Sequence, residues 1–148
     1  MSSPDPLAFK VLNEIGIIDQ LASHAFTQVL PRSMTIAQFS VLNHFVRLNH
    51  DWRTPAQLAS AFQVSRPTMS NTLARLERAG LVDISPDPED GRGKRVSVTA
   101  RGRAMRDDCI ARLAKPLAEM HAHVPSELIE KLDPLLTQLR QILDQMRD

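Results

Sequence analysis

Residues 65–99 read SRPTMSNTLARLERAGLVDISPDPEDGRGKRVSVT. The first half of this stretch repeats apolar residues at the spacing of one helix face, and Ser65 is a favourable N-cap for that helix. Gly80 provides a favourable C-terminal stop. The face that we expect to point into the core consists of Met69, Leu73 and Leu76. The stretch therefore opens with an amphipathic helix.

The apolar period then changes from helical to two. Val82 and Ile84 alternate with polar residues, as do Val96 and Val98, and this alternation predicts two short strands. The intervening residues 86–93 include two prolines and two glycines. We expect a projecting hairpin loop there and not a tight two-residue turn.

Three further helices are predicted before residue 65. An apolar stripe predicts a helix over residues 7–30, which a proline ends. Capping-box patterns at Thr35 and Thr54 begin helices of about 36–48 and 55–62. The helix at 55–62, a short turn and the helix that follows Ser65 are the components of a helix-turn-helix.

Helices also follow the hairpin. Thr99 is a favourable cap for a long fifth helix, in which Pro116 predicts a kink. Residues 126–146 carry an apolar stripe of period 3.5, which Asp133-Pro134 interrupts either as a kink or as the start of a new helix. We therefore expect a mainly α protein with a small β-hairpin wing.

The composition favours one domain spanning residues 1–148. Hydrophobic residues make up 43% of the chain and charged residues 24%, as in ordinary soluble proteins. There is no apolar run of the roughly 20 residues that a membrane helix needs, so we expect a cytoplasmic protein without a membrane partner. The only cysteine is Cys109, which excludes an internal disulfide and a multi-cysteine metal site.

Charge is distributed unevenly along the chain. Residues 1–52 contain three Lys or Arg against four Asp or Glu, residues 53–106 ten against five, and residues 107–148 five against eight. A basic middle segment favours a polyanionic partner such as nucleic acid, and a merely solvated basic face is the alternative. Residues 86–95 hold three basic and three acidic residues, so charge does not support a contact by the hairpin tip.

A helix-turn-helix followed at once by a β-hairpin is the winged-helix arrangement. The run Leu76–Val82, of pattern Leu-Glu-x-x-Gly-Leu-Val, and the Asp-x-Arg sequence at 90–92 followed by Thr99 resemble the MarR family of bacterial transcription regulators. The order of elements fits this family from about residue 7 to 147. The winged helix-turn-helix then covers about residues 35–99, and the dimerisation helices about 7–30 and 100–147.

The resemblance implies a homodimer that binds palindromic operator DNA, most simply as a repressor. Many family members release DNA when a small, often aromatic or phenolic, molecule binds between the lobes. We expect no cofactor. The effector cannot be identified from the sequence, and the conceivable lining residues, each more often ordinary core, are Phe26, Phe39, His44 and Trp52.

Individual residues can be assigned roles on DNA. Asn71 can form a bidentate pair with adenine, and Arg66 can reach guanine or a phosphate. The resemblance places Arg92 in the minor groove and makes Asp90 the orienting partner of an arginine. The residues that we expect to contact DNA are Ser65, Arg66, Pro67, Thr68, Ser70, Asn71, Arg75, Arg92, Lys94 and Arg95.

Apolar stripes at both ends of the chain need a partner. Each leucine left exposed would forgo about 1.5–3 kcal/mol. A two-fold dimer through the terminal helices covers them and spaces two recognition helices about 34–36 Å apart, whereas packing within one chain is the alternative. The residues that we expect in the interface are Leu7, Val11, Ile15, Leu128, Leu132, Leu135, Leu139, Ile142 and Met146.

Two other function classes agree less well with the sequence. An enzyme is not favoured, because Cys109 lies in an apolar helical stripe and no histidine has catalytic spacing with it. A zinc-responsive regulator of the same fold is the alternative that the five histidines raise. Only His121 and His123 are close in sequence, at a spacing that places them on different helix faces, so we predict no metal site.

Overall fold

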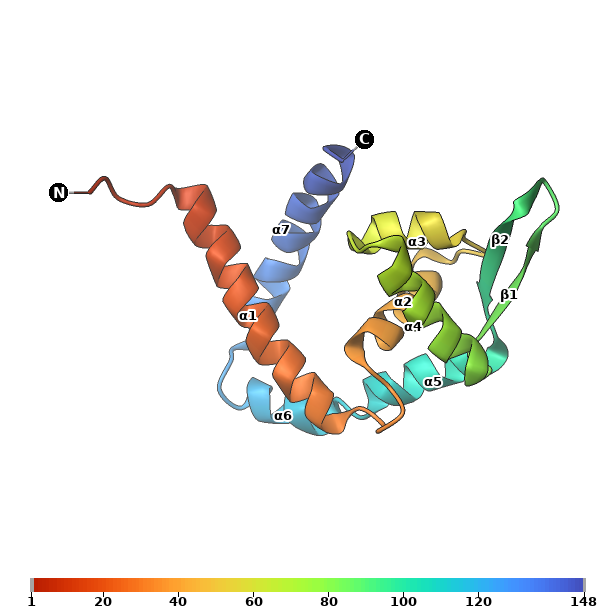
Figure 1. Ribbon diagram of the computed structural model, residues 1–148. Coiled ribbons are helices and arrows are strands. Elements are labelled where there is room, and N and C mark those ends of the chain that lie inside the picture. Colours follow the sequence, from red (N-terminus) through yellow and green to blue (C-terminus); the bar gives the residue numbers. More distant parts are fainter. Residues whose placement is uncertain (1, 148) are drawn as a thin grey trace. The chain divides into compact units, whose positions relative to one another are not determined.

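A computed structural model describes residues 2–147 of the chain. It contains two compact units, Met1–Arg112 and Leu113–Asp148. The elements of the first unit are α1 (Leu7–Val29), α2 (Ile36–Leu48), α3 (Pro55–Phe62), α4 (Arg66–Arg78), β1 (Val82–Asp87), β2 (Asp90–Val98) and α5 (Ala100–Ala111). Those of the second are α6 (Ala114–His121) and α7 (Ser126–Gln145) (Figure 1). The predicted fold class, mainly α with one small antiparallel hairpin, is confirmed.

The predicted helix starts are confirmed by their caps. Thr35 with Gln38 and Thr54 with Gln57 each form a complete capping box. Ser65 caps α4, because its Oγ accepts the backbone N–H of Thr68 at 3.2 Å. These bonds satisfy N–H groups that the first helical turn leaves without a partner.

The core of the first unit lies between α2, α3, α4 and the hairpin. The predicted inner face of α4 is buried, and it meets buried residues of α2 and α3. Among the described residues, the largest side chains that are almost completely buried are Phe45, Leu42, Leu58, Leu73, Leu76, Val41, Val82, Val96 and Cys109. This packing fixes α4 with its other face toward solvent. No helix within residues 2–147 is both long and apolar enough to cross a membrane.

The junction between α4 and α5 depends on glycine. Gly80 has a φ of +73°, which supports its prediction as the stop of α4. Thr99 donates its hydroxyl hydrogen to the Gly80 carbonyl at 2.7 Å and also caps α5 through the Gly102 N–H. A Cβ on Gly102 would lie only 2.1 Å from the Leu81 carbonyl oxygen. The backbones of α5 and the residue before β1 are therefore in direct contact.

The prediction of a projecting loop over residues 86–93 is wrong. The antiparallel pairing continues to Pro86 opposite Lys94, and after a bulge Asp87 faces Asp90. Only two residues separate the strands. The turn closes because the Asp87 carboxylate accepts the Glu89 N–H at 3.0 Å, and the surplus residues of β2 are absorbed by the bulge.

A short backbone pairing adds to the hairpin. Arg53 donates its N–H to the Val96 carbonyl at 2.9 Å and accepts the Val96 N–H at 2.8 Å. The link between α2 and α3 is therefore attached to β2. This pairing joins segments more than 40 residues apart, so no local sequence pattern predicts it.

Proline has different effects at two positions of the C-terminal helices. The kink predicted at Pro116 is instead a break, since α5 ends at Ala111 and α6 begins at Ala114. Proline lacks the N–H that would bond to the carbonyl four residues earlier, and its ring clashes with that carbonyl. Pro134 lies within the uninterrupted helix α7, which excludes the alternative of a new helix there.

Candidate nucleic-acid interface

The solvent-facing side of α4 is the first part of the candidate site. Its exposed residues include every predicted DNA contact on this helix, from Arg66 and Pro67 through Ser70 and Asn71 to Arg75. Their exposure follows from the burial of the opposite face in the core. The side chains that we assigned to base reading are therefore accessible to a partner.

The N-terminal end of α4 presents hydroxyl groups. The Ser65 hydroxyl donates to Thr68 Oγ1 at 2.8 Å while its oxygen accepts the Thr68 N–H. Thr68 Oγ1 acts as an acceptor in this pair, so its own hydrogen can donate to an external oxygen. Both residues are exposed. This end of the helix is chemically suited to an anion.

The tip of the wing presents Arg92. Its side chain is exposed, and its backbone N–H donates to Asp90 Oδ1 at 3.1 Å. Asp90 thus orients this arginine through the main chain. At Gly93 a Cβ would lie 3.2 Å from Asp90 Oδ2, so the turn leaves little room for a side chain there.

Arg95, in the middle of the wing, is held by two neighbouring side chains. Its Nε donates to Asp87 Oδ1 at 3.1 Å, and its guanidinium carbon lies 3.9 Å from the centroid of the Trp52 ring. Arg95 is half-buried by these contacts. The sequence predicts that Arg95 contacts DNA, whereas in the structure its guanidinium group is engaged by Asp87 and Trp52. Asp87 had no predicted role, and the single tryptophan, Trp52, is the one sequence feature that could have indicated this stack.

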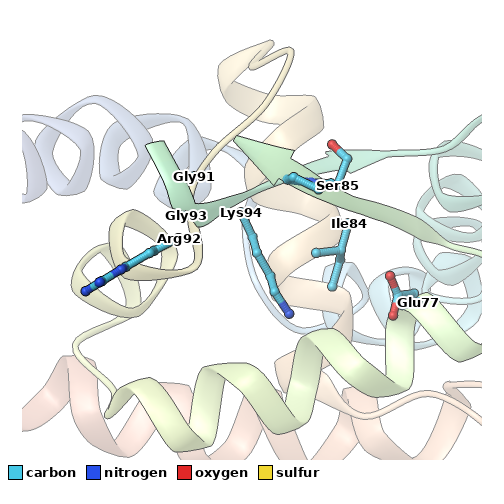
Figure 2. A pocket seen from close by; sticks show the side chains of 8 residues that line it. Glu77, Ile84, Ser85, Gly91, Arg92, Gly93 and Lys94 are labelled. Atoms are coloured by element: carbon cyan, nitrogen blue, oxygen red, sulfur yellow. The ribbon is translucent and has the colours of Figure 1, made fainter. Parts of the chain in front are cut away.

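A hollow of about 380 Å³ lies between the wing and α4. Figure 2 shows Lys94 pointing from β2 toward α4, with Ile84 beside it. Glu77 of α4 lines the same hollow. Lys94 is exposed and is therefore available to a partner on this side of the wing.

The histidines of the first unit lie near the link between α2 and α3. The ring centroids of His44 and His50 are 5.6 Å apart, and Arg53 donates to His50 Nε2 at 2.7 Å. Burial is the main cause that lowers the pKa of both histidines, and neighbouring positive charge, including Arg53, lowers it further. Within the described part of the chain, no three His, Cys, Asp or Glu side chains cluster in a way that could hold a metal ion.

Cys109 is buried in α5, as expected for a core cysteine. Burial, with a further contribution from Asp108, raises the pKa of its thiol. The thiolate is the reactive form of cysteine, so this environment disfavours chemistry at the sulfur.

The conceivable effector-lining residues make contacts within the first unit. Phe26 of α1 packs edge-on against Phe39 of α2 with ring centroids 4.8 Å apart. The ring centroids of His44 and Phe62 are 5.3 Å apart, and the guanidinium group of Arg95 covers the ring of Trp52. These contacts give each residue a packing role that does not require a ligand.

The predicted interface residues are largely exposed. Leu7 of α1 is 76% exposed, and Leu135 and Met146 of the second unit are 62% and 75% exposed. Ile15 and Leu139 are half-buried. The remaining exposed members of the predicted set are Val11, Leu128, Leu132 and Ile142. The described residues of α1 and α7 include none that is buried.

The chain is similar to known transcription regulators. A family model described as MarR family matches residues 32–93. The apo form of wild-type MarR from E. coli is 26% identical, with a TM-score of 0.75 over 93% of this chain and 98% of that chain. A mutant MarR from E. coli complexed with operator DNA is 25% identical, with a TM-score of 0.69 over 91% of this chain and 99% of that chain.

A third solved structure concerns regulation of DNA binding by a small molecule. BpsR from Bordetella bronchiseptica, whose DNA binding is regulated by 6-hydroxynicotinic acid, is 23% identical. Its TM-score is 0.67 over 90% of this chain and 98% of that chain. This similarity concerns the fold alone.

Proposed function

Because this chain belongs to the MarR family of winged-helix transcription regulators, we propose that it represses transcription as a homodimer bound to a palindromic operator. The observation that carries the proposal is the exposed face of α4, with the Arg92 wing beside it. A mutant of the similar MarR was solved with operator DNA, which supports the same class of partner.

In this proposal α4 is the recognition helix. Its N-terminal end enters the major groove, where Asn71 pairs with adenine and Arg66 contacts guanine or phosphate. Ser65 and Thr68 meet a phosphate oxygen at the helix start. Pro67 and Ser70 contact the groove walls, and Arg75 contacts the backbone.

The wing contributes contacts beside the recognition helix. Arg92 enters the minor groove, where narrow A·T-rich stretches concentrate negative potential, and Lys94 contacts phosphate. Arg95 acts mainly as a support, because Asp87 and Trp52 hold its guanidinium group. Residues 86–95 have no net charge, so the contribution of the wing to DNA binding depends on where Arg92 lies and not on the total charge of the wing.

The exposed apolar residues of α1 and α7 support a dimer. We propose one domain with a winged helix-turn-helix at about 35–99 and dimerisation helices at about 7–30 and 100–147. A two-fold dimer presents two recognition helices about 34–36 Å apart, and this spacing matches half-sites separated by one DNA turn. A small aromatic or phenolic effector would release the DNA, which is supported by the regulation of BpsR by 6-hydroxynicotinic acid.

The proposal is tested by quantitative gel shifts. Purified full-length protein is titrated against a panel of promoter fragments, including those nearest its own gene, at fixed salt. We expect one or a few fragments containing an inverted repeat to bind at least about a thousandfold more tightly than the rest. Equal affinity for all fragments would contradict the proposal.

A further inference from the structure

A second basic surface lies beside α4, separate from the hollow under the wing. An open hollow of about 490 Å³ lies between the last turn of α4 and the segment that joins α1 to α2. The polar residues that line it are Arg32, Ser33, Thr35, Gln38, Arg75 and Arg78. Two segments that are far apart in the sequence, residues 32–38 and 75–79, thus converge on one hollow, and its α1–α2 side was not predicted to contact DNA.

The hollow carries positive charge that the protein does not neutralise. Arg32, Arg75 and Arg78 line it, and no acidic side chain does. Within residues 2–147 these three guanidinium groups form neither an ion pair nor a hydrogen bond. Glu77, the acidic residue of this helix turn, lines the hollow on the wing side instead. Uncompensated guanidinium groups facing one space are suited to an oxyanion.

The α1–α2 side of the hollow is held by backbone bonds. Met34 donates its N–H to the Pro31 carbonyl at 2.9 Å, which closes a tight turn with Arg32 and Ser33 at its tip. Thr35 follows as the N-cap of α2, with its Oγ1 accepting the Gln38 N–H at 3.2 Å. The positive end of the α2 dipole therefore adds to the arginines at this place.

The hollow continues the exposed face of α4. Arg75 lies four residues after Asn71, and Arg78 lies three residues after Arg75, so the three share one helix face. A duplex that lies along this face therefore passes the arginines of the hollow. The turn at Arg32 forms the opposite wall.

We propose that this hollow binds a phosphate group of the DNA backbone, held between Arg32 and the two arginines of α4. The inference rests on the proposed function, because the duplex must first dock on α4. Guanidinium groups form two parallel hydrogen bonds with phosphate oxygens, and the Ser33 hydroxyl supplies a further donor. The contact adds affinity without base preference.

The test compares Arg32→Ala with Arg103→Ala, which removes an exposed arginine of α5 outside the hollow. Affinities for the preferred fragment and for a scrambled fragment are measured over a range of KCl concentrations. We expect Arg32→Ala to weaken binding to both fragments by the same factor of several-fold. We also expect it to reduce the slope of log K against log salt by about 1, as the loss of one phosphate contact requires. Arg103→Ala should leave both quantities unchanged.

Ethylation interference locates the contact. We expect one phosphate per half-site whose ethylation inhibits binding of the wild-type protein and of Arg103→Ala, but no longer affects Arg32→Ala.

If Arg32→Ala binds both fragments like wild type, with the same slope and interference pattern, the inference is overturned while the proposed function stands. If the wild-type protein itself shows no preferred fragment, the proposed function fails. The salt slope of Arg32→Ala on the scrambled fragment still tests the phosphate contact.

A free phosphate ion is the other source of the same chemistry. Inorganic phosphate is therefore titrated against the operator complex, with KCl at equal ionic strength as the reference. If phosphate displaces DNA from the wild-type protein more than from Arg32→Ala, while ethylation interference is identical in both, the hollow serves a free ion. That result would overturn the assignment to the DNA backbone.

Discussion

The guanidinium carbon of Arg95 lies 3.9 Å from the centroid of the Trp52 ring. The two residues are 43 positions apart, and their contact joins the wing to the link between α2 and α3. The Nε of Arg95 also donates to Asp87 Oδ1 at 3.1 Å. The backbone of Arg53, the residue after Trp52, pairs with that of Val96, the residue after Arg95. The middle of the wing is therefore held against the link between α2 and α3, while Arg92 near the turn stays exposed.

Replacement of Arg95 by alanine should loosen the wing. Partly buried cation–π contacts contribute about 0.5–2 kcal/mol, and the pair with Asp87 is lost as well. Because Trp52 is the only tryptophan, its fluorescence emission reports directly on this stack. We expect a changed emission spectrum and weaker operator binding. Arg103→Ala is the control, and an unchanged spectrum for Arg95→Ala would show that the stack does not persist in solution.

Arg92→Ala and Asn71→Ala should have different effects on DNA binding. Loss of the wing arginine removes a minor-groove contact, so affinity for the operator should fall strongly. Loss of Asn71 should remove about 1–3 kcal/mol of discrimination at a single base pair. Competition against operators substituted at each position measures both. Equal loss at every position for Asn71→Ala would argue against base reading by this residue.

Gly102→Ala should destabilise the first unit. Its new Cβ would lie 2.1 Å from the Leu81 carbonyl oxygen and 2.7 Å from Val98 Cγ2, and such overpacking costs about 1–3 kcal/mol. Gly16→Ala is the matched control, since it meets no atom within 4 Å in the middle of α1. It should stabilise the protein by about 0.5–1 kcal/mol through helix propensity. Urea denaturation of both variants measures the difference, and equal midpoints would contradict the contact.

Leu135→Glu should disrupt the dimer. Leu135 is 62% exposed on α7, and a charge in a buried apolar interface is strongly unfavourable. Sedimentation analysis should give a dimer for the wild-type protein and a monomer for the variant, with weakened operator binding. Leu48→Glu, on the exposed end of α2, is the control and should remain dimeric. A wild-type monomer at micromolar concentration would refute the proposed interface.

Stability should fall between neutral and mildly acidic pH. Burial and the nearby Arg53 lower the pKa of His44 and His50 in the folded protein, so below an ordinary value of ~6.5 the unfolded chain binds more protons. The contribution of these histidines is therefore present above that pH and is lost as pH falls through their folded-state pKa values. Thermal melts from pH 7.5 to 5 measure the loss. We expect His44→Phe to reduce the pH dependence, and an unchanged pH dependence in that variant would contradict the role of His44.

The helices could be predicted because their signals are local. A capping box at Thr35 or Thr54 requires only residues three positions apart, and the inner face of α4 follows from spacing within one helix. The resemblance to the MarR family rested on short motifs of the same kind, and it is confirmed. Proline was harder to interpret, because a helix can break as near Pro116 or continue as at Pro134, depending on its surroundings.

The amino-acid sequence alone determined the order of the elements as far as α5, the exposed face of α4 and the apolar character of both ends, but not the break between α5 and α6. Tertiary packing alone determines the closed turn of the wing, the stack of Arg95 on Trp52 and the hollow that Arg32 and Arg75 both line. The physical reason is sequence separation. Hydrogen bonds and caps within one turn leave a periodic pattern, whereas contacts between distant segments depend on how the whole core brings them together.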